Sequence, residues 1–546
     1  MSRAAGDGGA RRSCARHVLL RRVPRGARAA CRSSSAAALP RDLARHPCGS
    51  RAQRLPAGRR DRGRAALHPE PGALVARARR HRRVPARLVL IRRALVLPGG
   101  GDWRARRADI LIRDGRIAAV GDGLEDPEVI QGSSLLAVPG FINAHYHSPL
   151  SLLRGTADGL SHPAFMWQNQ ADTAGRSAHE VYVSALLGGV EMLASGTTAA
   201  IDHFPEQGFA LEHVDAVARA YRELGMRAAV ALRVFDEAYD DIVPPGGLPA
   251  GFPDPLKPAP LADTMALVEE AVKRHDGGLL RVFPAPSNPS RCSDALLVAC
   301  EELARRRHLG VHTHLLETEV QTRIARSRYG TTMVKHMDRL GLLSPRLSCA
   351  HTIWIDEDDI GLLAKRGATA VHNPESNLKV GAGFMPLPAM RRRGLRVALG
   401  TDGASTNDNL VLHEAMRLAV ILHRPNEERS SWARAEDALD MATAGGAAAL
   451  QCAGSLGRIA PGQSADIVLY DLTGARWTPC NDAAQQLVFA ENGDSVRTVL
   501  VAGRVVVDGG RVVSVDVDAL LREARGMLAG IRSRNGALQR AVKALL

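Results

Sequence analysis

Cysteine is scarce in this chain, and none of its eight cysteines forms a CxxC pair. Three of them lie within the first 48 residues, and the other five are spread between residues 292 and 480. A disulfide framework is typical of short secreted chains with closely spaced cysteines, so this pattern argues against one. We therefore expect reduced cysteines in an intracellular protein, and we place the protein in the cytoplasm.

Long apolar runs are also missing. No stretch of the sequence approaches the roughly 18 consecutive apolar residues that a membrane-spanning helix needs. No apolar segment near the N-terminus precedes a small-residue cleavage site, as a secretory signal peptide requires. The sequence therefore predicts a soluble protein without a membrane partner.

Lysine is absent from residues 1–88, which also contain only four acidic residues. The same segment carries 23 arginines, so its net charge is +19, whereas the other 458 residues together carry −4. Nucleic-acid binding depends on clustered basic residues that displace counterions from phosphates. Because the body of the chain is mildly acidic, we expect no nucleic-acid partner.

Residues 1–86 form an Arg- and Ala-rich tail without apolar periodicity of 2 or 3.6 residues. Such a segment buries too little apolar surface to fold, so we interpret it as disordered. Three explanations of its composition remain open: an upstream extension of the reading frame, an organellar transit peptide, or an electrostatic arm.

Short β-branched runs separated by glycine-containing turns occur at both ends of the remaining chain. They predict antiparallel strands in residues 87–137 and again in residues 454–515. We expect these two segments to build one small β-sandwich domain together. Residues 516–546 are expected to form a C-terminal helix.

Strand-like and helical segments alternate through residues 138–453, which is the pattern of a parallel α/β sheet. Eight such strands, each followed by a helix, match a (β/α)8 TIM barrel, whose catalytic groups lie at the carboxyl ends of the strands. The fold class expected is therefore α/β. The eight expected strands are Val138–His147, Thr197–Phe204, Arg227–Phe235, Leu279–Pro284, Leu309–Leu315, Leu347–Thr352, Ala368–His372 and Arg396–Gly400.

Metal-binding side chains follow several of these strands. His145 and His147 end the first strand and, being two residues apart, point to the same face. His314 ends the fifth strand and Asp402 follows the eighth. Three imidazoles and one carboxylate suit Zn²⁺ or Fe²⁺ with one position left for water. Chance would have to place all these groups at separate strand ends, so a metal site is the better interpretation.

Three further polar side chains belong to the same strand ends. Glu317 lies three residues beyond His314, and His351 ends the sixth strand. His312 shares a face with His314, but no carboxylate follows it at the spacing that Glu317 has from His314. We therefore expect His312 to lie outside the ligand set, in contact with it at most.

Five motifs in residues 87–515 resemble the amidohydrolase superfamily, in the branch that holds adenosylhomocysteine deaminases, guanine-type deaminases and triazine hydrolases. The resemblance implies that His145, His147, His314 and Asp402 bind a metal. It also implies that Glu317, His351 and Asp402 are catalytic, as acid–base and oxyanion-stabilising groups. The motifs are Pro139–His147, Leu152–Gly155, His314–Thr318, His372–Lys379 and Leu399–Ala404.

One metal ion is expected rather than two. Binuclear members of the superfamily bridge their metals through a carboxylated lysine at the end of strand four. Here that strand, Leu279–Pro284, contains no lysine. We therefore expect one divalent ion, with Zn²⁺ the first choice and Fe²⁺ the second.

The ligand set and Glu317 together predict a hydrolytic deaminase that releases ammonia from a purine, pterin or triazine ring. Ammonia leaves only when protonated, and a positioned carboxylic acid supplies that proton. Triazine-type dechlorination or hydrolysis of a cyclic amide on the same fold remains open, as does, more remotely, an inactive scaffold. We expect a homo-oligomer.

The substrate pocket is less well defined by the sequence. Adenosylhomocysteine-type members carry a Pro-His-Ser-Pro turn after strand four, whereas this chain has Pro-Ser-Asn-Pro at residues 286–289. That departure argues against adenosylhomocysteine itself. Arg154, Trp167, His203 and Asn288 are the candidate substrate-binding residues.

We expect that removal of residues 1–85 leaves folding, metal content and activity unchanged, because the first expected strand starts near Arg87. Melting temperature, elemental analysis and turnover of the truncated protein measure this. Loss of the metal or of turnover would contradict the interpretation of the tail.

Overall fold

The computed structural model describes residues 89–205, 210–237 and 259–544. The tail expected to be disordered, residues 1–86, lies outside these described residues. Within them, all five cysteines are free, and no helix combines the length and apolar character that a bilayer crossing requires.

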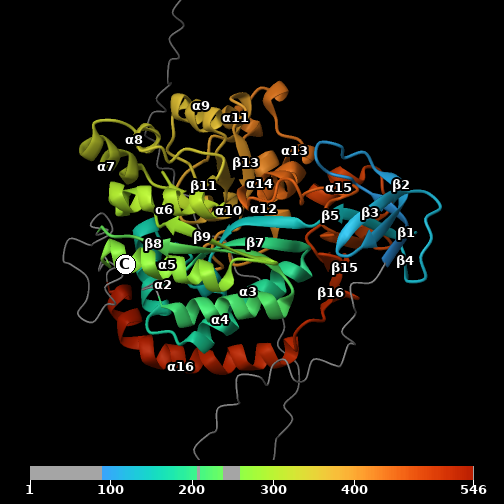
Figure 1. The fold of residues 1–546 in the computed structure, drawn as a ribbon, viewed down its shortest axis with the longest axis horizontal. Helices are drawn as coiled ribbons and strands as arrows, with labels where there is room; N and C mark the ends of the chain where they lie inside the picture. The colour runs from blue at the N-terminus through green and yellow to red at the C-terminus, as the bar shows by residue number, and fades with distance from the viewer. Residues whose placement is uncertain (1–88, 206–209, 238–258, 545–546) are drawn as a thin grey trace, which may run out of the picture. The chain divides into compact units, whose positions relative to one another are not determined.

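Eight parallel strands form the centre of the chain, as expected from the alternating pattern (Figure 1). They are hydrogen-bonded as two runs of four, with β9 lying beside β10 and β13 beside β6. This arrangement is that of a TIM barrel. The strands are β6 (Phe141–Tyr146), β7 (Thr197–Phe204), β8 (Arg227–Val234), β9 (Leu280–Pro286), β10 (Val311–Leu315), β11 (Leu347–His351), β12 (Thr369–His372) and β13 (Arg396–Leu399).

Amphipathic helices connect the strands, and several begin with a side-chain cap. Ser177 caps α3 in a capping box with Glu180, and Ser293 and Asp356 cap α6 and α9. Such caps satisfy the free N–H groups of the first turn. The connecting helices are α2 (His162–Thr173), α3 (Ala178–Ala194), α4 (Leu211–Leu224), α5 (Leu261–His275), α6 (Asp294–Arg307), α7 (Glu319–Tyr329), α8 (Met333–Arg339), α9 (Glu357–Arg366), α10 (Pro374–Lys379), α11 (Leu387–Arg392) and α12 (Leu412–Ile421).

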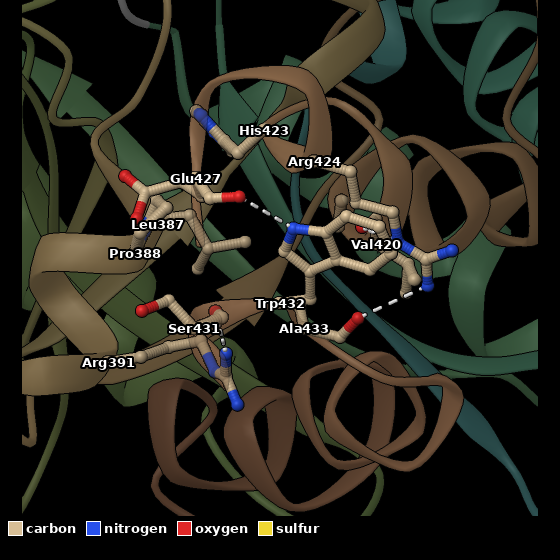
Figure 2. A pocket seen from close by; sticks show the side chains of 11 residues that line it. Leu387, Pro388, Arg391, Val420, His423, Arg424, Glu427, Ser431, Trp432 and Ala433 are labelled. Atoms are coloured by element: carbon tan, nitrogen blue, oxygen red, sulfur yellow. Dashed lines mark hydrogen bonds between the residues drawn. The ribbon is translucent and has the colours of Figure 1, made fainter. Parts of the chain in front are cut away.

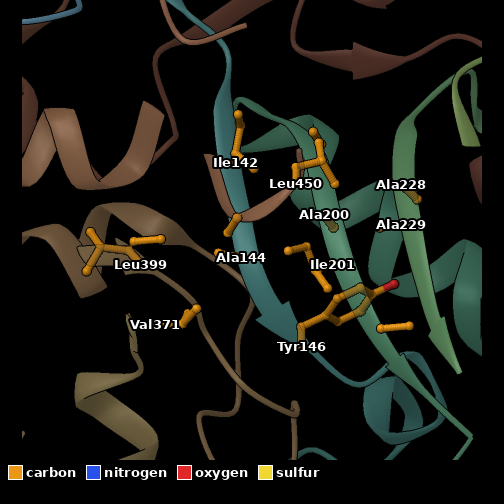
Figure 3. Packing of buried hydrophobic residues seen from close by; sticks show 14 of the residues in the cluster. Ile142, Ala144, Tyr146, Ala200, Ile201, Ala228, Ala229, Val371, Leu399 and Leu450 are labelled. Atoms are coloured by element: carbon orange, nitrogen blue, oxygen red, sulfur yellow. The ribbon is translucent and has the colours of Figure 1, made fainter. Parts of the chain in front are cut away.

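Nearly all residues of the barrel strands are buried, so their side chains divide between the barrel interior and the helices. In β6, Ile142, Ala144 and Tyr146 alternate with Asn143 and His145. The first three belong to the apolar core shared with the neighbouring strands (Figure 3). Because strand side chains alternate in direction, this packing leaves the face of Asn143 and His145 for polar side chains.

Strands from both ends of the described chain form one nine-stranded sheet. The join is the antiparallel pairing of β5 with β14, in which Ala137 is opposite Leu469. The strands are β1 (Val89–Val96), β2 (Arg106–Arg113), β3 (Arg116–Gly121), β4 (Val129–Gln131), β5 (Leu135–Pro139), β14 (Ile467–Asp471), β15 (Val496–Val501), β16 (Arg504–Asp508) and β17 (Arg511–Val512).

The strand expected over Val138–His147 is in fact two strands, which is a correction to the sequence interpretation. Val138 and Pro139 pair with β14 in the small sheet, and the barrel strand β6 starts at Phe141. Gly140 separates them, and a Cβ atom there would lie 2.2 Å from Oγ1 of Thr198. The residues on either side of Gly140 are apolar in both strands, so residue type alone did not reveal the division.

The C-terminal helix α16 (Val517–Lys543) is capped by Asp516 and packs on α2 and α3 (Figure 1). Its Asn535 side chain donates hydrogen bonds to the carbonyl oxygens of Asp172 (3.3 Å) and Ala174 (3.1 Å). These bonds hold the C-terminal end of α2, whose other end reaches the site described next. Three short helices precede α16: α13 (Ala435–Asp440), α14 (Gly446–Ala449) and α15 (Ala483–Phe489).

Candidate metal centre and active site

The carboxyl ends of three barrel strands, β6, β10 and β13, bring the expected ligands together, and β11 adds His351. Potential ligand atoms of His145, His147 and His314 lie within 4.8 Å of one another. The same limit holds for a group formed by His145, His351 and Asp402. The two groups share His145, so the expected ligands form a single cluster.

The distances within this cluster leave room for one ion among the side chains. Nε2 of His147 lies 3.3 Å from Nε2 of His314. Oδ1 of Asp402 lies 3.3 Å from Nε2 of His147 and 3.5 Å from Nε2 of His145. Separations of this size fit donors arranged around a common centre at metal–ligand distances of roughly 2.0–2.2 Å. The residues present therefore fit a bound divalent ion.

A chain of hydrogen bonds determines which nitrogen of His145 faces the cluster. The Ser348 hydroxyl donates to the carbonyl of Val311 (3.3 Å), so it accepts from Nδ1 of His312 (2.7 Å). Nε2 of His312 is then an acceptor and receives Nδ1–H of His145 at 2.8 Å. This leaves the lone pair of His145 Nε2 available for a metal. That buried nitrogen has no hydrogen-bond partner among the described residues.

The other imidazoles are oriented in a similar way. Nδ1 of His314 donates to the backbone carbonyl of Ser287 at 2.7 Å, which turns its Nε2 towards His147. Nδ1 of His351 lies 2.8 Å from Oδ1 of Asn377, to which it donates. Nε2 of His351 is therefore the nitrogen left without that bond, and it faces Asp402 (4.0 Å).

Burial favours the neutral form of His145, His312 and His314, and the neutral imidazole is the form that binds a metal. Desolvation lowers the pKa of His145 to about 4, although Asp402 acts in the opposite direction. Desolvation and the neighbouring imidazoles also hold the pKa of His314 and of His312 well below the usual range.

The backbone turns sharply where two of the side chains enter the cluster. His351 has φ of 70° and Asp402 has φ of 60°, both in the left-handed region that non-glycine residues rarely adopt. The amide of Asp402 donates to the carbonyl of His145 (3.0 Å), and its Oδ2 accepts from the Ser376 hydroxyl (2.5 Å). These bonds keep the carboxylate beside the imidazoles.

Glu317 lies at the edge of the cluster, between two imidazoles. Oε1 is 3.9 Å from Nε2 of His351, and Oε2 is 3.2 Å from Nε2 of His162. Burial alone would raise the pKa of Glu317, but these two histidines lower it to about 2. The side chain is therefore a carboxylate at neutral pH.

A pocket opens directly above the cluster and encloses about 480 Å³, including the part open to solvent. Asn288, one of the expected substrate-binding residues, lines it. The lining consists of His147, Leu150, His162, Phe165, Met166, Asn169, Arg233, Ser287, Asn288, His314, Glu317, His351, Asp402 and Thr406.

The other three expected substrate-binding residues do not line this pocket in the described part of the chain. Arg154 pairs with Glu191 and donates to the backbone carbonyl of Asp408 (3.1 Å), so it tethers loops. Trp167 packs on the other side of α2 with Val542 of α16. His203 is fully buried, with its ring centre 4.5 Å from that of His314.

Sequence reasoning did not single out the residues that α2 contributes to the pocket. His162, Phe165, Met166 and Asn169 lie one helical turn apart on one face of α2. Their spacing of three and four residues is a signal of a shared helix face. Arg233, near the end of the third barrel strand, was missed as well, although its position follows the rule that located His314.

A second, smaller pocket lies among α11, α12 and the segment after α12 (Figure 2). Its polar groups bond to one another: the Trp432 indole donates to the carbonyl of Glu427 (2.9 Å). The Arg424 guanidinium lies 5.1 Å from the centre of the Trp432 ring. None of the residues of the metal cluster lines it.

Comparison with known proteins agrees with this geometry. Residues 136–506 match the amidohydrolase family model. The chain is 34% identical to a 5-methylthioadenosine/S-adenosylhomocysteine deaminase of Syntrophobacter fumaroxidans, over 78% of this chain and 94% of that protein. It is also 34% identical to a 5'-deoxyadenosine deaminase of Methanothermobacter thermautotrophicus, again over 78% and 94%.

Solved structures give the same result. A zinc-bound adenosine deaminase of Xanthomonas campestris superposes with a TM-score of 0.72 at 28% identity, covering 82% of this chain and 98% of that one. A zinc complex of atrazine chlorohydrolase from Arthrobacter aurescens has a TM-score of 0.72 at 26% identity, covering 81% and 100%. This chain is a hydrolase acting on carbon–nitrogen bonds, and it belongs to the amidohydrolase family.

Proposed function

We propose that this amidohydrolase releases ammonia from an aminated purine-type heterocycle, using one divalent metal ion held by His145, His147, His314 and Asp402. The observation that supports it most is the position of Glu317 and His351. Both face the pocket in which the ligand group lies. A proton donor, a proton acceptor and a metal site thus converge on one small-molecule cavity.

A divalent ion bound there would lower the pKa of its water from 15.7 towards about 7. Asp402 is placed to take a proton from that water. Glu317, ionised beforehand, would take up one of the water's two protons for the ring nitrogen next to the attacked carbon, and the other would leave with the amine as ammonia. His351 would stabilise the oxygen that becomes negatively charged when its Nε2 carries a proton, since its Nδ1–H is already donated to Asn377.

The pocket walls suit a flat ring with polar edges. Phe165 and Met166 contribute apolar surface from α2, while Asn169, Asn288 and Arg233 contribute amide and guanidinium groups. An aromatic ring packs well on the first kind of wall, and its ring nitrogens and carbonyl groups need the second kind. The deaminases to which the chain is similar are named for adenine nucleosides, which have this combination of features.

The experiment is an ammonia-release assay with the purified metal-loaded protein. We expect turnover of 5'-deoxyadenosine or methylthioadenosine, or of free aminated purines and pterins if the ribose does not fit. Absence of ammonia from the whole set would contradict the proposal.

A triazine is the second candidate, because the atrazine chlorohydrolase superposes over most of the chain. Chloride needs no proton to leave, whereas an amine does, so the two reactions differ in proton transfer to the leaving group. Assaying chloride and ammonia side by side separates the two reactions, and we expect ammonia.

The metal content is expected to be close to one ion per chain, with zinc preferred over iron. Barrel strand four, β9, contains no lysine that could bridge a second ion. Elemental analysis after gel filtration measures the ratio. Two tightly held ions per chain would overturn the one-metal assignment.

A further inference from the structure

Helix α2 presents a histidine to the pocket at its first position. His162 follows the N-cap residue Ser161 and precedes Pro163, which is favoured in the first helical turn. The His162 residue is only 7% exposed, and its ring packs edge-on against Phe165, with ring centres 5.0 Å apart. Its imidazole is therefore part of the pocket wall.

The two oxygens of Glu317 face different imidazoles. Nε2 of His162 lies 3.2 Å from Oε2, whereas Oε1 faces Nε2 of His351 at 3.9 Å. The backbone N–H of Glu317 is itself bonded to the side chain of Gln321 at 3.0 Å. The main chain of Glu317 is thus fixed, and the rotation of its carboxylate depends on these side-chain neighbours.

We infer that His162 is the positioning residue for Glu317: by binding Oε2 it directs Oε1 towards His351 and the metal cluster. This inference rests on the proposed deaminase function, because it concerns the carboxylate that carries the proton. A proton carrier must present the same oxygen to the water and to the substrate at hydrogen-bond distance. A carboxylate free to rotate would spend less time in that geometry.

Contacts with α16 anchor helix α2, which carries His162. The end of the helix distant from His162 is held by α16, through Asn535 and the carbonyl oxygens of Asp172 and Ala174. Trp167, in the middle of the helix, packs with Val542 of α16. His162 is therefore carried by an anchored helix rather than by a free loop, as a positioning role requires.

The test compares two substitutions at this position. His162→Phe keeps a flat ring against Phe165 but removes the donor, and His162→Gln keeps a donor of similar reach. We expect His162→Phe to lower kcat by about 10- to 100-fold, the size of effect that misplacement of a reacting group produces. We expect KM to change much less and His162→Gln to recover most of kcat. Metal content should remain equal in all three proteins.

His179→Ala is the matched control, because His179 lies at the start of the next helix, α3, and pairs with Glu523 outside the pocket. We expect it to retain wild-type kcat. Equal loss of kcat in the Phe and Gln variants, or no loss in either, would overturn the inference.

A second readout does not depend on turnover. In protein labelled with ¹⁵N-histidine, the Nε2 resonance of His162 is identified as the one that is missing from the His162→Phe variant. We expect Glu317→Gln to shift that resonance. An unchanged resonance would contradict the contact even if no substrate were turned over. Conversely, a wild-type protein that releases no ammonia would contradict the proposed function. The shift of the His162 resonance would then still decide whether His162 contacts Glu317.

Discussion

Replacing Glu317 by glutamine is expected to lower ammonia release by about 10²- to 10⁴-fold, the usual contribution of a positioned proton-transfer group. Glutamine keeps the size and the hydrogen-bonding reach of the side chain, but it cannot accept and return a proton. The metal should remain bound, because Glu317 is not among the ligands. Steady-state ammonia release and elemental analysis of the same preparation measure both effects.

Glu319→Gln is the matched control for this substitution. Glu319 lies two residues further on, exposed in the first turn of α7, and does not line the pocket. We expect it to leave the rate unchanged. A Glu317→Gln protein that deaminates its substrate within a few-fold of the wild-type rate would refute the proposed proton transfer.

Replacing His145 by alanine is expected to remove the metal and the activity together. The substitution deletes a ligand nitrogen and also leaves Nε2 of His312 without the donor it now has at 2.8 Å. Changes in residues that only support a ligand already weaken metal binding by about 10- to 100-fold. Loss of the ligand itself should exceed that range. Metal content after dialysis and residual turnover measure the effect.

The melting temperature of His145→Ala should also stop responding to added zinc, because an ion stabilises only the folded state that binds it. His336→Ala is the control, since His336 is similarly buried but pairs with Asp294 outside the cluster. We expect its metal content to be that of the wild type. A His145→Ala protein that retains a full equivalent of metal would show that His145 is not a ligand.

The sequence alone was sufficient to predict the barrel and the meeting of the proposed ligands at one rim. Apolar strand-like runs alternate with helical segments along the chain, and this alternation predicted the eight βα units. The periods of the apolar residues, 2 in strands and 3.6 in helices, indicate which face of each element is buried. The barrel fold then implies that all strands end at the same rim. His145, His147, His314, His351 and Asp402 could therefore be predicted to meet, although they are far apart in the chain.

The pocket could not be obtained in the same way. Arg154 and Asn288 are both polar residues in loops, yet only Asn288 lines the cavity. Loop direction depends on contacts such as that between Arg154 and Glu191, which join residues of separate segments. Local sequence does not encode such contacts. The candidates chosen from loops therefore included one residue that lines the cavity and one that does not.

The sequence by itself therefore determined the fold class, the strand ends and the types of side chain they carry, because periodicity and residue chemistry are local properties. Only the tertiary structure decided the division of the first strand at Gly140, where the chain passes too close to Thr198 for a side chain. It also decided that His162 faces Glu317, since α2 is placed by its packing against α16. Those outcomes depend on three-dimensional distances between segments remote in sequence, which no local pattern contains.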